Sequence, residues 1–347
     1  MNREYRAADS NRGLAAKVDR LRQPQAYADR PDAVIVIETH MSWVFLEGHF
    51  AYKLKKPVRE PFLDYSTLQL REHYCHEEVR LNRRLAPGVY QGVVPLTKDA
   101  GGQLQLDGKG EVVEWLVKMR RLHRDDMLDN VIRDRAPPEG QIRRIGEMLA
   151  AFYREQPAVG MSGEDYSRRC EAAVLLNQGL LSDPLLELPH DQINAVHAAL
   201  LSVLRRARNQ FAARAARIVE GHGDLRPEHI CLETPPVIFD RLEFNREFRL
   251  LDPVDELSYL AMECERFGRA EIGGRVLDIY AEYAGDQPPS MVREYYMAYR
   301  ASLRARLSAM HIRDRPRTAW PRWLTQAGNY LRIAQEHCRA FSNCQAS

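Results

Sequence analysis

The chain has 347 residues, of which 28% are charged and 45% hydrophobic, and its formal net charge is only +2. This length allows two lobes with cores of their own, and the near balance of charge gives no electrostatic footprint for nucleic acid, so a nucleic-acid partner is disfavoured. Because no stretch resembles a secretory signal or is long and apolar enough to cross a bilayer, we expect a cytoplasmic protein without a membrane partner.

The first third of the chain alternates short apolar runs with turn residues. Its predicted elements are a short helix near residues 14–21 and strands at residues 33–39, 42–46 and 50–55. Residues 47–49 fit a hairpin turn between the second and third strands. Alternation with a period of two places Ala51, Lys53 and Lys55 on one face of the third strand. A solvated basic strand end is the ordinary alternative for the two lysines.

A helix is predicted over residues 68–85. Tyr74, Glu78, Leu81 and Leu85 fall along one stripe at spacings of three and four. Glu78 therefore faces inward, where a carboxylate needs a cationic partner to offset its desolvation. Glu77 stays open as the alternative, because helix phase is not fixed to one residue by sequence. An exposed glutamate is the other interpretation.

The pattern at residues 111–119 predicts the last strand of a small N-terminal lobe, and a polar stretch follows. We therefore expect a hinge here, with a lobe of strands and one main helix at residues 1–117 and a mainly helical lobe at residues 118–347. The predicted fold class is α+β, with a small mixed lobe and a larger helical one.

Residues 222–232, HGDLRPEHICL, have the features of a rigid loop centred on Asp224. Gly221 and Gly223 permit unusual backbone angles, Pro227 fixes one dihedral angle, and a short apolar strand follows. A second apolar run at residues 237–239 ends at Asp240. Two short strands therefore present two aspartates, for which capping of turns is the structural alternative.

The sequence HGDLRPEHICL followed by IFDRLEFN resembles the aminoglycoside phosphotransferase-like branch of the kinase fold, in which His-Gly-Asp replaces the His-Arg-Asp of protein kinases. The resemblance implies a two-lobed kinase-like fold. It implies that Asp224 is the base that accepts a hydroxyl proton and that Asp240 holds the metal on the nucleotide phosphates. By the same resemblance, Lys53, with Lys55 second, positions the phosphates, and Glu78 orients Lys53.

The resemblance also points to the nucleotide contacts. The sequence contains neither G-x-G-x-x-G nor G-x-x-x-x-G-K-[ST], so glycine-rich loops and a Walker site are not expected. Thr39, His40 and Ser42 at the first hairpin are then the candidate phosphate-covering segment, with turn residues as the alternative. Backbone groups of the hinge strand would contact adenine, which implicates Val117, Lys118 and Met119.

Two longer segments, IETHMSWVFLEGHFAYKLKKPV and CHEEVRLNRRLAPGVYQGVVPL, resemble the kinase-like half of bacterial bifunctional phosphotransferase and ATP-binding proteins. In those relatives a P-loop domain commonly follows. This sequence is expected to correspond to the kinase-like half without the P-loop domain.

One position departs from the family pattern, because His229 stands where the family carries an Asn as a second metal ligand. Imidazole suits magnesium less well than an amide oxygen does. Three interpretations stay open. His229 ligates another metal such as manganese, Glu228 supplies the missing oxygen, or the chain binds nucleotide without efficient turnover.

Two helices are predicted after the catalytic segment. Asp252, Asp255 and Glu256 form the acidic start of the first, as the helix dipole favours. We interpret Asp252 and Asp255 as structural or supporting residues in preference to substrate contacts. Arg300 and Arg304 lie where relatives carry a Tyr-Arg helix beside the catalytic loop, with a solvated helix face as the alternative.

The leading hypothesis is an ATP-dependent phosphotransferase, with GTP as the other donor, that acts on a hydroxyl of a small molecule with magnesium or manganese. The alternative is a nucleotide-binding pseudokinase that regulates or scaffolds a protein partner, which His229 motivates. A protein kinase is disfavoured by His-Gly-Asp and by the lack of an Ala-Pro-Glu segment after Asp240.

Overall fold

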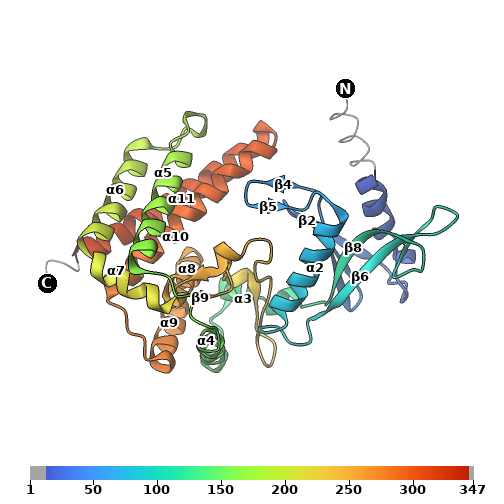
Figure 1. Ribbon diagram of the computed structural model, residues 1–347, viewed down its shortest axis with the longest axis horizontal. Coiled ribbons are helices and arrows are strands. Elements are labelled where there is room, and N and C mark those ends of the chain that lie inside the picture. The colour runs from blue at the N-terminus through green and yellow to red at the C-terminus, as the bar shows by residue number, and fades with distance from the viewer. Residues whose placement is uncertain (1–12, 344–347) are drawn as a thin grey trace. The chain divides into compact units, whose positions relative to one another are not determined.

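A computed structural model of the chain describes residues 13–343. The described chain divides into two compact units (Figure 1). Residues 13–126 and Val237–Arg246 form the first unit, and residues 127–236 and 247–343 form the second. The α+β class is confirmed, with a sheet in the first unit and mainly helices in the second.

The first unit contains a six-stranded antiparallel sheet in the order β1-β2-β3-β8-β6-β7. The strands are β1 (Val34–Glu38), β2 (Ser42–Glu47), β3 (Phe50–Lys55), β6 (Tyr90–Lys98), β7 (Leu104–Leu106) and β8 (Glu111–Arg120). Gly48, at φ +30°, lies in the turn between β2 and β3, which confirms the predicted hairpin. Two short strands, β4 (Arg59–Glu60) and β5 (Leu63–Asp64), form a separate hairpin.

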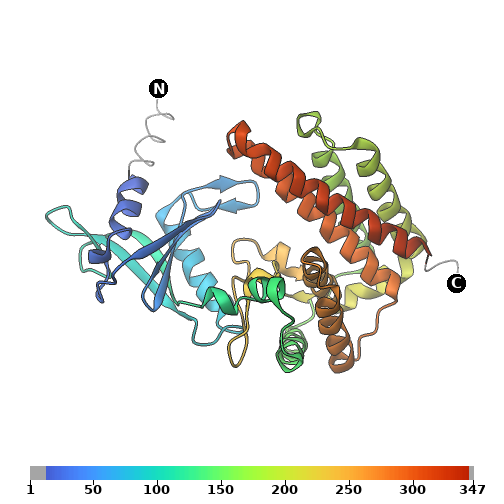
Figure 2. The same cartoon turned by 180° about the vertical axis from the view of Figure 1, so that it is seen from behind.

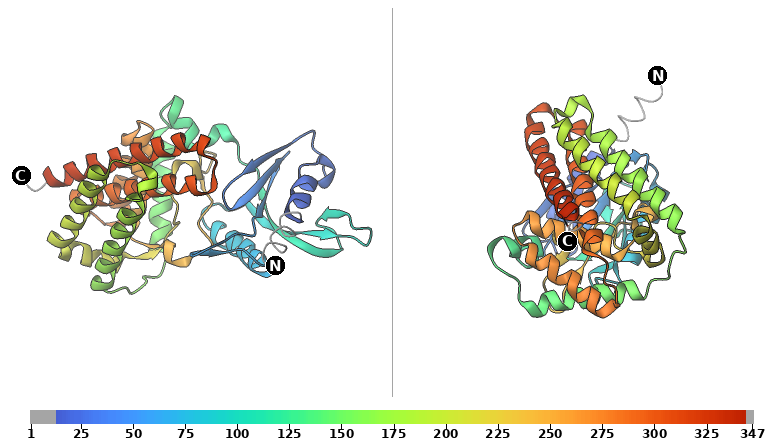
Figure 3. Two further views of the ribbon diagram at one scale, coloured as in Figure 1. Left: turned by 90° about the horizontal axis from the view of Figure 1, so that it is seen from above. Right: turned by 90° about the vertical axis from the view of Figure 1, so that its left-hand side faces the viewer.

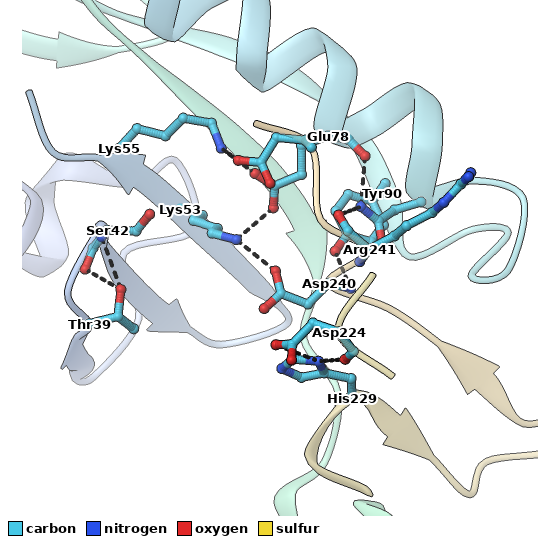
Figure 4. A network of polar contacts seen from close by, with 12 residues as sticks. Thr39, Ser42, Lys53, Lys55, Glu78, Tyr90, Asp224, His229, Asp240 and Arg241 are labelled. Carbon is cyan, nitrogen blue, oxygen red and sulfur yellow. Dashed lines mark hydrogen bonds and ion pairs between the residues drawn. The ribbon is translucent and has the colours of Figure 1, made fainter. Parts of the chain in front are cut away.

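The two faces of this sheet carry different side chains. Leu54 of β3 belongs to an apolar core with Phe45, Leu116 and Leu21, and Leu21 ends the helix at residues 13–21. The opposite face of β3 presents Lys53 and Lys55 to Glu78 of α2 (Leu68–Asn82), as Figure 4 shows. Figure 2 shows the same sheet and helix from behind. The predicted alternation thus separates an apolar core from a charged face.

Helix α2 begins as predicted and ends three residues earlier than predicted. Its N-cap, Thr67, accepts a hydrogen bond from Leu70 N through its hydroxyl at 3.2 Å, which satisfies a free N–H of the first turn. The helix ends at Asn82, and Leu85 belongs to the turn that follows. Pro87, two residues later, is incompatible with further helix because it lacks an N–H and restricts the preceding residue.

The division into units differs from the boundary between residues 117 and 118 that the sequence suggested. Strand β8 runs through Arg120, so the boundary would cut a paired strand. The segment Val237–Arg246, which includes β11 (Val237–Ile238), also belongs to the first unit although it is more than a hundred residues away in sequence. Long-range contacts of this kind leave no local pattern in the sequence.

The second unit is built mainly from helices (Figure 3). They are α3 (Leu128–Asp134), α4 (Glu139–Arg154), α5 (Gly163–Leu181), α6 (His190–Arg206), α7 (Arg208–Arg214), α8 (Pro253–Arg266), α9 (Ala270–Ala284), α10 (Ser290–Met310) and α11 (Trp320–Asn343). The short strands β9 (Val219–Glu220) and β12 (Leu250–Leu251) pair with each other, and β10 (Ile230–Cys231) follows the loop around Asp224. Helices α10 and α11 pack side by side and form a long hairpin.

Single turns of 3-10 helix complete the described chain. They are η1 (Pro24–Ala26), η2 (Arg124–Asp126), η3 (Pro184–Leu186), η4 (Ala215–Arg217), η5 (Pro227–His229), η6 (Arg246–Arg249), η7 (His311–Asp314) and η8 (Arg317–Ala319). Among residues 13–343, every helix is too short or too polar to cross a membrane.

Candidate functional site

The first unit joins Lys53, Glu78 and Asp240 (Figure 4). The Nζ atom of Lys53 donates to Glu78 Oε1 at 2.8 Å and to Asp240 Oδ1 at 2.7 Å. Strand β3, helix α2 and the residues after β11 each supply one member. Glu77 instead pairs with Arg80 on the exposed side of α2, so Glu78 is the lysine partner that the helical stripe indicated.

Burial and charge vary along this cluster. Glu78 is fully buried, whereas the Asp240 side chain is 39% exposed and forms the open end. Burial disfavours the charged form of Lys53, yet Asp240 and Glu78 outweigh it and raise the pKa of this lysine well above its usual value. Lys53 therefore remains an ammonium group at every physiological pH.

The backbone at Asp240 is held in an uncommon conformation. Its φ is +61°, in the left-handed region that costs a residue other than glycine roughly 1 kcal/mol or more. Asp240 N donates to the Tyr90 hydroxyl at 3.1 Å, and Arg241 N donates to Asn82 Oδ1 at 2.7 Å. These bonds to β6 and α2 hold the turn that directs the Asp240 carboxylate toward Lys53.

Lys55 also contacts Glu78, so the two lysines that the sequence left as alternatives share one carboxylate. Lys55 Nζ donates to Glu78 Oε2 at 2.5 Å and pairs with Glu243. Glu243 also accepts a hydrogen bond from the Tyr65 hydroxyl. Sequence reasoning missed Glu243 and Tyr65 because each is an ordinary residue in its local sequence, and only the fold brings them to Lys55.

The second unit holds the loop that carries Asp224. The Glu256 carboxylate of α8 accepts hydrogen bonds from His222 N at 2.8 Å, Gly223 N at 2.5 Å and the Tyr153 hydroxyl at 2.7 Å. A Cβ atom at Gly221 would lie 2.6 Å from Glu256 Oε2, so this approach requires glycine. The sequence marked Glu256 only as part of an acidic helix start, and the structure shows that it supports the loop.

The Asp224 carboxylate is surrounded by donors. Arg226 Nε and Nη2 donate to its two oxygens at 3.0 Å each, and the Tyr259 hydroxyl donates to Oδ1 at 3.0 Å. Burial opposes ionisation, but the charges of Arg226, His229 and Arg304 outweigh it and hold the pKa of Asp224 well below its usual range. Asp224 is therefore a carboxylate at neutral pH.

His229 lies against the same loop (Figure 4). Its Nδ1 is 2.8 Å from the carbonyl oxygen of Asp224, and its Nε2 is 3.2 Å from Arg226 Nη2. Both ring nitrogens thus face loop atoms. Glu228 pairs with Arg266 at 3.2 Å. Over residues 13–343, no cluster of three His, Cys, Asp or Glu side chains could hold a metal by itself.

The acidic residues at the start of α8 make structural ion pairs. Asp252 caps the helix through Val254 N and binds Arg214 at 2.6 Å. Asp255 binds Arg300 at 2.6 Å. These contacts agree with the structural interpretation of both aspartates.

Arg304 of α10 lies 3.0 Å from Glu263. Its guanidinium also acts on Asp224, whose pKa it helps to lower. The alternative of a solvated helix face therefore fails for Arg304, and it fails for Arg300, which is buried against Asp255.

The structure limits the expected nucleotide contacts. The Thr39 hydroxyl accepts from Ser42 N at 2.9 Å and donates to Ser42 O at 3.0 Å, so it closes the turn before β2. His40 lies in that turn.

Val117, Lys118 and Met119 lie inside β8, between β3 and β6, and are paired on both sides. Their partners in β6 include a register shift between Tyr90 and Gly92, opposite Met119 and Lys118. The sheet extends to Arg121, whose N–H donates to His49 O at 2.8 Å.

No protein-family model matches the chain. An uncharacterized protein of Mycobacterium tuberculosis strain H37Rv is 31% identical over 319 residues, or 87% of this chain. Uncharacterized proteins of M. tuberculosis strain CDC 1551 and of Mycobacterium bovis match to the same extent. The chain spans 59% of the length of these relatives.

Solved structures give a likeness over most of the chain. A choline/ethanolamine kinase family protein from Mesorhizobium loti has a TM-score of 0.54 at 15% identity, over 94% of this chain and 99% of that one. A thermostable mutant of an aminoglycoside phosphotransferase has a TM-score of 0.51 at 13% identity, over 89% and 94%. The GDP and kanamycin complex of APH(2'')-IIia has a TM-score of 0.50 at 15% identity, over 88% and 94%. The chain has the aminoglycoside phosphotransferase-like kinase fold.

Proposed function

We propose that the chain is a small-molecule phosphotransferase that moves the γ-phosphoryl group of ATP or GTP to a hydroxyl acceptor. The observation that carries this proposal is the Lys53, Glu78 and Asp240 cluster, which joins three distant segments into one charged group. A half-buried lysine oriented by a glutamate, beside an aspartate with an open face, suits the binding of nucleotide phosphates and their metal.

The residues present fit a hard divalent cation. Lys53, Lys55, Glu78, Glu243 and Asp240 together carry two positive and three negative charges, and the cluster is open at Asp240. In our proposal Asp240 holds Mg²⁺ or Mn²⁺, which would neutralise charge on the β- and γ-phosphates. Lys53 then turns from Asp240 to the phosphates, while Glu78 keeps its ammonium group in place.

Asp224 is proposed to act on the acceptor. Its carboxylate accepts a hydrogen bond from the acceptor hydroxyl and orients the oxygen toward the γ-phosphorus. The new O–P bond forms as the bond to the bridging oxygen of the nucleoside diphosphate breaks, and the hydroxyl proton passes to Asp224. Because Asp224 is a weak base, this proton transfer comes late, and positioning is its main contribution.

Two further assignments follow from the geometry. The Arg226 guanidinium, which contacts both oxygens of Asp224, is proposed to neutralise charge that develops on the transferred phosphoryl group. The adenine contact is proposed for backbone groups at this strand end, either at residues 117–119 or at residues 122–123, which follow the hydrogen bond from Arg121 N to His49 O.

The fold neighbours support a small acceptor. Their names include choline/ethanolamine kinase and aminoglycoside phosphotransferase, and one structure holds GDP and kanamycin. A test is the release of ADP or GDP in a screen of hydroxylated metabolites with Mg²⁺ or Mn²⁺. Asp224→Asn should lower kcat by about 10²–10⁴ and leave nucleotide affinity unchanged. Asp191→Asn, at an exposed position of α6, is the matched control. Full turnover by Asp224→Asn contradicts the assignment.

The contacts of His229 favour a second candidate, a nucleotide-binding pseudokinase. Its ring nitrogens face the Asp224 carbonyl and Arg226, so it stands in the place of a metal ligand while contacting the loop. This candidate predicts nucleotide binding without turnover in either metal. His229→Asn should then raise magnesium-dependent turnover or nucleotide affinity, and unchanged values would remove the support that His229 gives to this candidate.

A further inference from the structure

The Glu78 carboxylate contacts two lysines, although one lysine would be enough to form an ion pair with it. Its Oε1 accepts from Lys53 at 2.8 Å and its Oε2 accepts from Lys55 at 2.5 Å, and the carboxylate is fully buried. Lys53 is the outer of the two lysines, with 16% of its side chain exposed, whereas Lys55 has none. The inner lysine therefore cannot reach a nucleotide, and its contacts need another explanation.

Lys55 links α2 to the segment that carries Asp240. Besides Glu78, its ammonium group contacts Glu243, which lies three residues after Asp240 and is itself buried. The Tyr65 hydroxyl donates to the same Glu243 carboxylate, and the Tyr65 ring centroid is 5.0 Å from Lys55 Nζ. Desolvation of three charged groups costs several kcal/mol unless their partners are this close, so the contacts depend on one another.

The charges of this group persist over the working pH range. Burial opposes ionisation of Lys55, but Glu243 and Glu78 raise its pKa above the usual value. Burial likewise opposes ionisation of Glu243, and Lys55 and Lys53 lower its pKa. Lys55 and Glu243 therefore form an ionic pair in this structure.

We infer that Lys55, Glu243 and Tyr65 form a latch that keeps the Asp240 segment on helix α2 when Lys53 leaves Asp240 for nucleotide phosphates. This inference rests on the proposed function. In the structure Lys53 makes one of the contacts that hold Asp240, and phosphate binding would remove it. The latch, with the Asn82 and Tyr90 bonds to the backbone of this segment, holds Asp240 without Lys53. Lys55 and Glu243 are thus positioning residues that act through Glu78 and Asp240.

The test uses calorimetry to compare the binding of ATP to the full chain with and without Mg²⁺. In Glu243→Gln, binding of ATP without metal should stay within about twofold of the original chain, because Lys53 is intact. The Mg²⁺ concentration that produces half of its maximal effect on ATP binding should rise about 10–100-fold, as for other residues that support a metal ligand. Tyr65→Phe removes one hydroxyl, retains the ring, and should shift the same constant in the same direction by a smaller factor.

Glu111→Gln is the matched control, because it makes the same change at an exposed residue of β8 in the same unit. It should leave both constants unchanged. A folded Glu243→Gln with an unaltered Mg²⁺ constant overturns the latch, as does an equal loss of binding with and without metal. If Glu243→Gln does not fold, Tyr65→Phe decides by the same criterion. Failure of the proposed function is distinct, because the unmodified chain would then release no ADP or GDP with any acceptor, whether or not it binds ATP.

Discussion

The two regions that carry the candidate site residues are built in different ways. In the first unit, Lys53, Glu78 and Asp240 come from three segments, and the lysine and aspartate are 187 positions apart. In the second unit, the contacts of Asp224 with Arg226 and His229 lie within five positions. The Asp224 loop therefore combines local contacts with support from Tyr259 and Glu256 of α8, whereas the lysine cluster takes all its contacts from distant segments. Variants of the first cluster should accordingly affect stability most.

The largest expected effect follows loss of Glu78. Glu78→Ala removes the carboxylate that both Lys53 and Lys55 contact, and should lower the free energy of unfolding by about 3–5 kcal/mol, because buried charges lose a partner. Urea unfolding followed by circular dichroism measures this loss. Glu77→Ala, at the neighbouring half-buried position, should change the free energy by less than about 0.5 kcal/mol. Equal losses in the two variants would remove the distinction between them.

The next effect tests whether the Asp224 loop is as local as its sequence suggests. Glu256→Ala leaves His222 N and Gly223 N without their charged acceptor, and should lower the free energy of unfolding by about 3 kcal/mol. Turnover should fall with it, because the loop backbone is no longer fixed. Tyr153→Phe, which removes one hydroxyl from the same carboxylate, should cost about 1 kcal/mol. A stable Glu256→Ala would show that the loop holds itself.

A third test concerns a charged group of the second unit that is assembled over long range, as the lysine cluster is. His337 of α11 lies 2.6 Å from Glu294 of α10 and 3.0 Å from Glu265 of α8. Burial lowers its basicity, but the two glutamates prevail and raise the pKa of His337 to about 9.

Protonated His337 stabilises the fold, because its pKa is higher in the folded chain than in the unfolded chain. This contribution is complete below the unfolded pKa near 6.5 and is lost as pH rises through the folded pKa of about 9. Because the glutamates are partly exposed, we expect a loss of about 1–2 kcal/mol between pH 6.5 and 9.5. In His337→Gln, the free energy of unfolding measured across this pH range should no longer show this decrease. An identical slope in the variant would exclude His337 as its source.

The smallest effect is a shift in pH dependence. Arg226 is the main cationic neighbour that lowers the pKa of Asp224, so Arg226→Gln should raise this pKa. A depressed carboxylate pKa means that the ionised form persists as pH falls, and raising the pKa moves the acidic limb of the kcat profile to higher pH by about one unit. Turnover measured from pH 2 to pH 7, within the range in which circular dichroism shows both chains folded, tests the shift. An unmoved limb would mean that Asp224 does not set it.

Several features were predicted from local sequence because local chemistry determines them. The alternation in β3 placed Lys53 and Lys55 on one face, and the stripe in α2 turned Glu78 inward. The hairpin between β2 and β3 followed from Gly48 and its neighbours. The expected adenine contact at residues 117–119 stays a prediction, and the sequence did not show that this strand is paired on both edges.

The sequence by itself determined the strand and helix patterns, the glycines and proline of the Asp224 loop and the candidate charges, since each depends on neighbours within a few residues. Only the tertiary structure decided which charges meet. It selected Glu78 over Glu77, gave Lys55 and Glu243 to each other, and made Glu256 the support of the Asp224 loop. The physical reason is that buried charges require partners, and those partners come from whichever distant segments the fold brings within hydrogen-bond reach.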